Sequence, residues 1–195
     1  MQPEPTARTP RKGFLHRLLK DRRGAGAIEF AFIAPVMIVL YIGAVEVTAA
    51  MSVNKKLARA SSTVADLLTQ EQETDKDKLM NMVNVAQSIM APYPHAPVNV
   101  VVTGINVDED GIATVDWSWK PNDAKGEPAY VEGSETEIPD NLRIADTYLV
   151  RSELTYRHDM ITSFPFTGET MTGIDMGKTY HLRPRIGSKV DCTDC

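Results

Sequence analysis

The sequence predicts an α+β protein, in which a long N-terminal transmembrane helix continues into an amphipathic helix and an exported domain with an antiparallel sheet follows. Three observations predict this class. A long apolar run lies near the N-terminus of the 195-residue chain, helical periodicity continues beyond it, and alternating strand patterns appear only after the helices. Helices followed by strands are typical of an antiparallel sheet packed against helices. The length allows one modest globular domain in addition to the anchor.

Residues 1–24 form a basic leader. They contain seven of the 21 Lys and Arg residues but only two of the 26 Asp and Glu residues, so the chain after Gly24 is acidic. Nucleic-acid-binding proteins carry their basic patch on the folded domain, and this distribution therefore argues against a nucleic-acid partner. A basic segment before an apolar helix follows the positive-inside rule and predicts a cytoplasmic leader.

Residues 25–50 are predicted to anchor the chain in the membrane. No charged residue occurs from position 30 to 45, and small residues extend the apolar run at both ends, where Glu29 and Glu46 interrupt it. A spanning helix needs about 20 mainly apolar residues, so the segment is long enough if both glutamates lie near the membrane interfaces. With the leader inside, residues 51–195 form the exported domain.

Two other interpretations of the apolar run stay open at this point. Residues 1–50 could act as a removable signal peptide, with Thr48-Ala49-Ala50 as the cleavage site, and the rest would then be a secreted or periplasmic binding module. The run could instead be a buried core helix. Apolar residues on every face of the helix and the basic cluster directly before it disfavour that second interpretation.

The junction between leader and anchor carries the most specific motif of the chain: Asp21-Arg22-Arg23-Gly24-Ala25-Gly26-Ala27-Ile28-Glu29-Phe30. It resembles type IV-like prepilins, whose short basic leader ends in Gly and is removed by a membrane aspartyl protease that cuts after this Gly. The motif and the residues that follow it, Ala-Phe-Ile-Ala-Pro-Val-Met, resemble the TadE/TadG-like pseudopilins of tight-adherence (Flp) pilus systems. Those are minor pilin-like proteins required to build the pilus. The similarity covers roughly residues 21–50.

The resemblance implies processing after Gly24 by a prepilin peptidase. Ala25 would become the new N-terminus, Glu29 the fifth residue and Phe30 the aromatic residue that follows it. The resemblance also implies a single-pass protein of the bacterial inner membrane with a periplasmic C-terminal domain of pilin-like outline. Its partners would be other pilus-assembly proteins and pilin subunits, and its role would be to support pilus biogenesis and surface adhesion.

Glu29 lies at the cytoplasmic end of the apolar run, where an isolated carboxylate is costly unless it has a partner. Cleavage after Gly24 would create an α-amine on Ala25, one helical turn away in the same chain or available from a neighbouring subunit. Either amine would supply the opposite charge. The alternative is that Glu29 is solvated at the interface.

Helical periodicity continues from the anchor to about Gln70. The predicted stripe that faces the domain consists of Ala50, Asn54, Leu57, Ser61, Val64 and Leu68, and it is widened by Met51, Ala58, Ala60 and Leu67. A separate short helix packed on the domain is the alternative to one continuous helix. A second amphipathic helix is predicted from Asp75 to Ala91, and prolines end it.

Strand patterns occupy the second half of the chain. A strand from Val98 to Val107, a turn at 108–111 and a returning strand through Ala113 and Trp119 predict an antiparallel hairpin. Residues 121–140 are predicted to form a loop, and 144–157 a strand with Tyr148, Val150, Leu154 and Tyr156 on one face. The last strand is predicted over 178–186, and Pro184 within it favours an edge position.

Cys192 and Cys195 are the two cysteines of the chain. In an exported domain a disulfide between them is the expected state, with free or redox-active thiols and a metal site as alternatives. Zinc normally takes four ligands, and His181 would add little to this pair. The sequence shows no nucleophile elbow, phosphate loop or paired-carboxylate motif. We therefore predict no catalytic residues, no cofactor and no metal, with an anchored exported enzyme as the third hypothesis.

Overall fold

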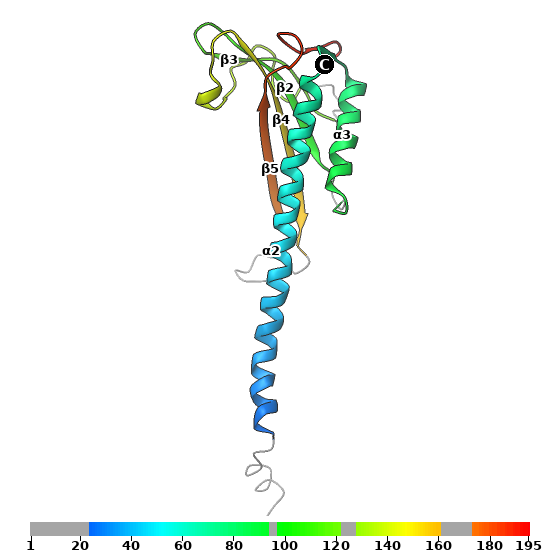
Figure 1. Cartoon of the computed structure of the whole chain (residues 1–195), viewed down its shortest axis with the longest axis vertical. Coiled ribbons are helices and arrows are strands. Elements are labelled where there is room, and N and C mark those ends of the chain that lie inside the picture. The colour runs from blue at the N-terminus through cyan, green and yellow to red at the C-terminus, as the bar shows by residue number, and fades with distance from the viewer. Residues whose placement is uncertain (1–23, 94–96, 122–127, 161–172) are drawn as a thin grey trace, which may run out of the picture. The chain divides into compact units, whose positions relative to one another are not determined.

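The computed structural model describes residues 24–93, 97–121, 128–160 and 173–195. The chain divides into two compact units, Met1–Val45 and Glu46–Cys195, each of which we describe by itself. The elements in chain order are α2 (Ala25–Thr69), β1 (Glu73–Thr74), α3 (Lys76–Met90), β2 (Asn99–Val107), β3 (Ala113–Trp119), the short helix η1 (Asp140–Leu142), β4 (Thr147–Asp159), β5 (Gly173–Leu182) and β6 (Asp191–Cys192) (Figure 1). This order confirms the predicted α+β class.

Helix α2 is a single continuous helix that ends one residue before the predicted end at Gln70, so the alternative of a separate short helix is wrong. Its buried stripe in the globular unit contains the predicted Leu57, Ser61, Val64 and Leu68 and departs from the prediction only at its start. Asn54 is exposed and Val53 is fully buried. The stripe therefore follows Val53, Leu57, Ala60, Ser61, Val64, Ala65 and Leu68. The apolar anchor gives no helical phase, and contact with the sheet selects the buried face.

Helix α3 lies where it was predicted. Its capped N-terminal end and the helical spacing of its apolar residues are visible in the sequence. Asp75 is the N-cap, and its side chain accepts a hydrogen bond from Lys78 N at 2.8 Å. The buried residues are Leu79, Met82, Val83, Ala86 and Met90. Lys56 of α2 donates hydrogen bonds to the carbonyls of Ile89 and Ala91 at the other end of α3. Its cation lies where the helix dipole is negative.

A four-stranded antiparallel sheet with the order β3-β2-β4-β5 forms the rest of the core (Figure 1). Alternating side chains of β4, among them Tyr148, Val150, Leu154 and Tyr156, face the core cluster that α2 and α3 also form. This face was predicted from the alternation along the strand. The sheet is therefore covered by both helices on one side.

The predicted bounds of the last two strands are wrong. Strand β4 begins three residues later than predicted, and β5 begins at Gly173 and ends at Leu182, so Pro184 lies beyond the strand. β5 is an edge strand, as predicted, but Pro184 is not the reason. After β5 the chain leaves the sheet, and Arg185 N donates to Thr69 O at the end of α2.

The opposite face of the sheet has a smaller core formed by Ile105, Val107, Ala113, Leu149 and Ile138, with Leu142 packed against it. Within the predicted loop 121–140, Ser134 and Thr136 bond to the edge strand β3, and Ile138 packs into this smaller core. Arg151 of β4 also holds this segment, because its Nη1 donates to Thr136 Oγ1 at 2.8 Å and its guanidinium lies 4.5 Å from the ring centre of Tyr130. Arg151 also pairs with Glu153 at 3.2 Å.

The C-terminal tail was not predicted to join any sheet, but β6 pairs in parallel with β1. Val190, just before β6, is fully buried. Its carbonyl accepts hydrogen bonds from Trp117 Nε1 at 2.7 Å and from the Tyr148 hydroxyl at 2.9 Å. The tail is thus held to the sheet on one side and to the segment between α2 and α3 on the other.

Candidate membrane anchor and processing site

The first part of α2 is apolar and exposed all around. Phe30 and Phe32, on opposite sides of the helix, are 70% and 76% exposed, and Ile38, on a third side, is 58% exposed. The most apolar stretch of 18 residues has a mean hydropathy of 2.2 and no buried residue. A core helix of a globular protein buries at least one face, so this segment is not a core helix.

Helix α2 is long and apolar enough to cross a membrane once. At a rise of about 1.5 Å per residue, ~20 residues cross a hydrocarbon core of about 30 Å. A signal sequence would satisfy the same test of length and composition. Glu46, which the sequence places at the outer end of the anchor, is buried and is the first residue of the globular unit.

Gly24 immediately precedes α2 and is exposed. Its carbonyl accepts hydrogen bonds from Ala27 N at 3.1 Å and Ile28 N at 3.2 Å, which begins the helix. A Cβ atom added to Gly24 would meet no atom of the residues that the structure describes within 4 Å. The folded chain therefore imposes no steric reason for glycine here, and any such requirement would come from a molecule that binds this position.

Glu29 and Phe30 lie on the second turn of α2, and both are exposed. Glu29 follows Ala25 by four residues, which puts the two positions on the same side of the helix, one turn apart. Among the described residues, the side-chain carboxylate of Glu29 has no hydrogen-bonding or ion-pairing partner. The predicted processing residues Gly24, Ala25, Glu29 and Phe30 therefore lie together at the start of α2, with the carboxylate available to a group outside the folded chain.

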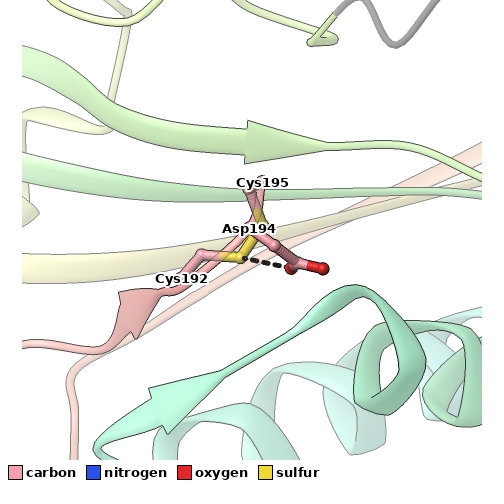
Figure 2. A group of neighbouring side chains, drawn as sticks. All are labelled: Cys192, Asp194 and Cys195. Carbon is pink, nitrogen blue, oxygen red and sulfur yellow. Dashed lines mark hydrogen bonds between the residues drawn. A yellow bond between two sulfur atoms is a disulfide. The ribbon is translucent and has the colours of Figure 1, made fainter.

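The predicted disulfide between Cys192 and Cys195 is present, with the two Cα atoms 5.6 Å apart (Figure 2). Both sulfurs are bonded to each other, so neither is a thiolate ligand in this state. Asp194, between them, accepts a hydrogen bond from Lys76 N at 2.9 Å and thereby caps the first turn of α3. The dashed line in Figure 2 joins Cys192 Sγ to Asp194 Oδ1 at 3.9 Å; a disulfide sulfur has no proton to donate, so we regard this as a contact.

The sequence did not predict the hydrogen bonds of Tyr148 beneath the C-terminal tail. The Tyr148 hydroxyl lies 2.9 Å from both Asp116 Oδ2 and Val190 O and shares its one proton between these two acceptors, and burial together with the Asp116 carboxylate raises the pKa of Tyr148. The residue therefore stays a neutral donor at physiological pH. No local sequence pattern links these positions, which are far apart in the chain. The alternation of β4 predicted that Tyr148 faces the core, but not its hydrogen-bonding partners.

Comparison with known proteins agrees with the N-terminal motif. Residues 24–66 match the family model described as TadE-like protein. The match begins at Gly24, spans the anchor and continues along the part of α2 that packs in the globular unit; it covers less than a quarter of the chain. Neither a curated protein nor a solved structure matches the chain. The match confirms the TadE-like resemblance and indicates a component of a Tad pilus-assembly system.

Proposed function

We propose that this protein is a pseudopilin-like structural and assembly component of a tight-adherence (Flp type IV-like) pilus, and that it supports pilus biogenesis and surface adhesion. The family match that starts at Gly24 and follows α2 into the globular unit is the observation that carries the proposal. A long helix that is apolar first and amphipathic later supports it. The role is structural rather than catalytic.

In this proposal, residues 1–24 are a cytoplasmic leader and the globular unit lies in the periplasm. A prepilin peptidase cuts between Gly24 and Ala25. Two features of Gly24 support this step. It has no side chain, and the space that a Cβ atom would occupy is open, so an enzyme can approach the peptide bond from this side. The two flanking arginines, Arg22 and Arg23, would keep the leader on the cytoplasmic side.

Cleavage also changes the charge at the start of the anchor. It produces an α-amine on Ala25 in the same layer as the Glu29 carboxylate. A pair between these groups lowers the cost of keeping either of them close to the hydrocarbon. If the amine and the carboxylate belong to adjacent subunits, processing and assembly are coupled, because an uncut chain has no amine to offer.

A complementation experiment separates this function from that of a released binding module. In cells that lack the protein, pili are counted after expression of the full chain or of Glu46–Cys195 behind a cleavable signal peptide. The released form keeps the whole globular unit. We expect the full chain to restore pili and the released form to fail, although both accumulate to equal levels and resist protease equally. Restoration by the released form would show that the anchor is dispensable and would overturn the proposal.

A further inference from the structure

We propose that the outer edge of β5 accepts an additional β-strand from a different exported subunit, through main-chain hydrogen bonds. β5 is ten residues long and pairs with β4 along its whole length, from Gly173–Asp159 to Leu182–Val150. It is the last strand of the sheet (Figure 1). This inference extends the proposed function by assigning a docking surface, and it rests on the membrane anchorage proposed above.

The outer side of β5 carries unused hydrogen-bonding groups. In an antiparallel pair, alternate residues direct their N–H and C=O groups away from the neighbouring strand. Among the described residues, no main-chain group bonds to β5 from that side. Within the described ranges, a single side-chain bond reaches its main chain, from Ser61 Oγ of α2 to Lys178 O at 3.3 Å. Most of the edge is therefore free to pair with an extended chain.

At the opposite edge of the sheet, another segment of the chain occupies the main-chain hydrogen-bonding groups of β3. Three main-chain bonds join β3 to a passing segment of the chain. Gly133 N donates to Val115 O at 2.8 Å, Val115 N to Ser134 O at 2.9 Å, and Thr136 N to Ala113 O at 2.9 Å. β5 lacks such a cover among the described residues, and its register with β4 runs without a bulge. Long unprotected edges are the usual sites of strand addition.

The side chains of β5 define the kind of strand that fits. Lys178 pairs with the core residue Leu154 and so belongs to the helix-facing side, together with Ile174 and Tyr180, which are 36% and 37% exposed. Lys178 has no ion-pair partner in the part of the chain that the structure describes. A strand with apolar side chains near Ile174 and Tyr180 and an acidic side chain near Lys178 would complement this side.

A second copy of the chain does not satisfy the geometry. Two β5 strands related by a twofold axis would run antiparallel, with the axis perpendicular to the sheet. The part of α2 in the globular unit, residues 46–69, lies beside β5 (Figure 1), where Ser61 Oγ donates to Lys178 O, so these two helical segments would also run in opposite directions. The two chains would then enter their globular units at Glu46 from opposite ends of the paired sheet. Chains that come from one membrane do not meet this requirement, and we therefore assign a different subunit as the occupant.

Photocrosslinking in cells that assemble pili tests this inference on the full chain. The photoreactive residue p-benzoylphenylalanine replaces either Thr179 of β5 or Gln87, an exposed residue of α3 that serves as the matched control. We expect an adduct from position 179 but not from position 87, and mass spectrometry should identify an extended segment of another exported protein. An adduct to a second copy of the chain, or no adduct above the level at position 87, would overturn the inference.

Charge reversal gives the second measurement. Combined with the probe at position 179, Lys178→Glu should reduce the adduct about tenfold, because a cross-strand attraction becomes a repulsion, whereas Lys178→Arg should preserve it. Equal adduct yields for the two variants would contradict the predicted acidic partner. The mature N-terminus is determined in the same cells. A missing adduct in correctly processed chains rejects strand addition without affecting the proposed function.

Discussion

In the proposed function, Glu29 links the processing of the chain to its assembly. It is the charged residue nearest to the cleavage position inside the apolar part of α2, and it lies one turn from the amine that cleavage would release. Its exposure on an isolated chain matters because a carboxylate near hydrocarbon needs an opposite charge or water. In the proposed function, a neighbouring subunit would offer that charge only after its own leader had been removed.

Glu29→Gln distinguishes pairing from simple solvation. Glutamine is close to glutamate in shape but has no charge, so we expect cleavage and membrane insertion to continue while pilus assembly falls sharply. Glu29→Asp, which keeps the charge on a shorter side chain, should retain more assembly. Electron microscopy and immunoblots of the membrane fraction provide the measurements. Normal piliation by the glutamine variant at wild-type abundance would leave Glu29 as a solvated residue at the end of the anchor.

Gly104 supports the hydrogen bonds that hold the C-terminal tail. A Cβ atom at this position would lie 2.6 Å from Trp117 Nε1 and would also collide with the Tyr148 hydroxyl, and both groups donate to Val190 O. We expect Gly104→Ala to lower the free energy of unfolding by about 1–3 kcal/mol through overpacking. Gly177→Ala is the control, because its Cβ would meet Thr155 Cγ2 at an ordinary 3.7 Å. Thermal unfolding of the detergent-solubilised full chain provides the measurement. A similar loss of stability in both variants would contradict this explanation.

At the level of whole elements, the accuracy of sequence-based prediction followed the strength of the local signal. α3 was predicted nearly to the residue because Asp75 caps it and its apolar side chains recur regularly. β5 was shifted because Gly173 and Gly177 weaken its strand pattern, and pairing with β4 determines its bounds. The two-residue strand β6 has no pattern to detect, and its pairing with β1 joins residues more than a hundred positions apart.

The candidate site was likewise predictable only where a local sequence signal exists. Gly24, Ala25, Glu29 and Phe30 are consecutive or nearly so, and a local motif identifies them. The burial of Arg151 could not be read from β4, where a charged residue in an alternating strand normally faces solvent. Its position depends on Tyr130 and Thr136, which fold over the sheet from a segment without regular structure.

The contact between α2 and α3 depends on Lys56. α3 has no basic residue in its last turn, and Lys56 of α2 supplies the cation to its terminal carbonyls. We expect Lys56→Met, which keeps the aliphatic length, to lower the free energy of unfolding by about 1 kcal/mol. Lys55→Met is the matched control on the exposed side of α2. Thermal denaturation followed by circular dichroism should show a lower Tm for the first variant alone, and equal Tm values would remove Lys56 from this role.

For the molecule as a whole, the distribution of charge determines the expected orientation. The basic leader precedes an apolar helix, and the rest of the chain is acidic. Cytoplasmic flanking segments are enriched in Lys and Arg, so the globular unit should lie on the opposite side of the membrane. The disulfide between Cys192 and Cys195 agrees with an oxidising compartment such as the periplasm.

Reporter fusions after Cys195 test this orientation, and this position leaves β6 and the disulfide intact. Alkaline phosphatase, which is active only outside the cytoplasm, should be active in the fusion, whereas a fluorescent protein that requires the cytoplasm should be dark. Substituting Arg22 and Arg23 with Gln should weaken this preference. Cytoplasmic activity alone would reverse the orientation and remove the oxidising environment that the disulfide requires.

The mature N-terminus decides most directly between a processed pilus component and the alternatives. The protein is isolated from membranes of cells with and without the prepilin peptidase, and its first residue is determined by mass spectrometry. We predict Ala25 when the peptidase is present, and the intact leader when it is absent or when Gly24→Val fills the open space before α2. A first residue of Met51 would instead identify a signal peptide, and an intact leader in cells that contain the peptidase would identify an ordinary signal anchor; either result would contradict processing as a pseudopilin.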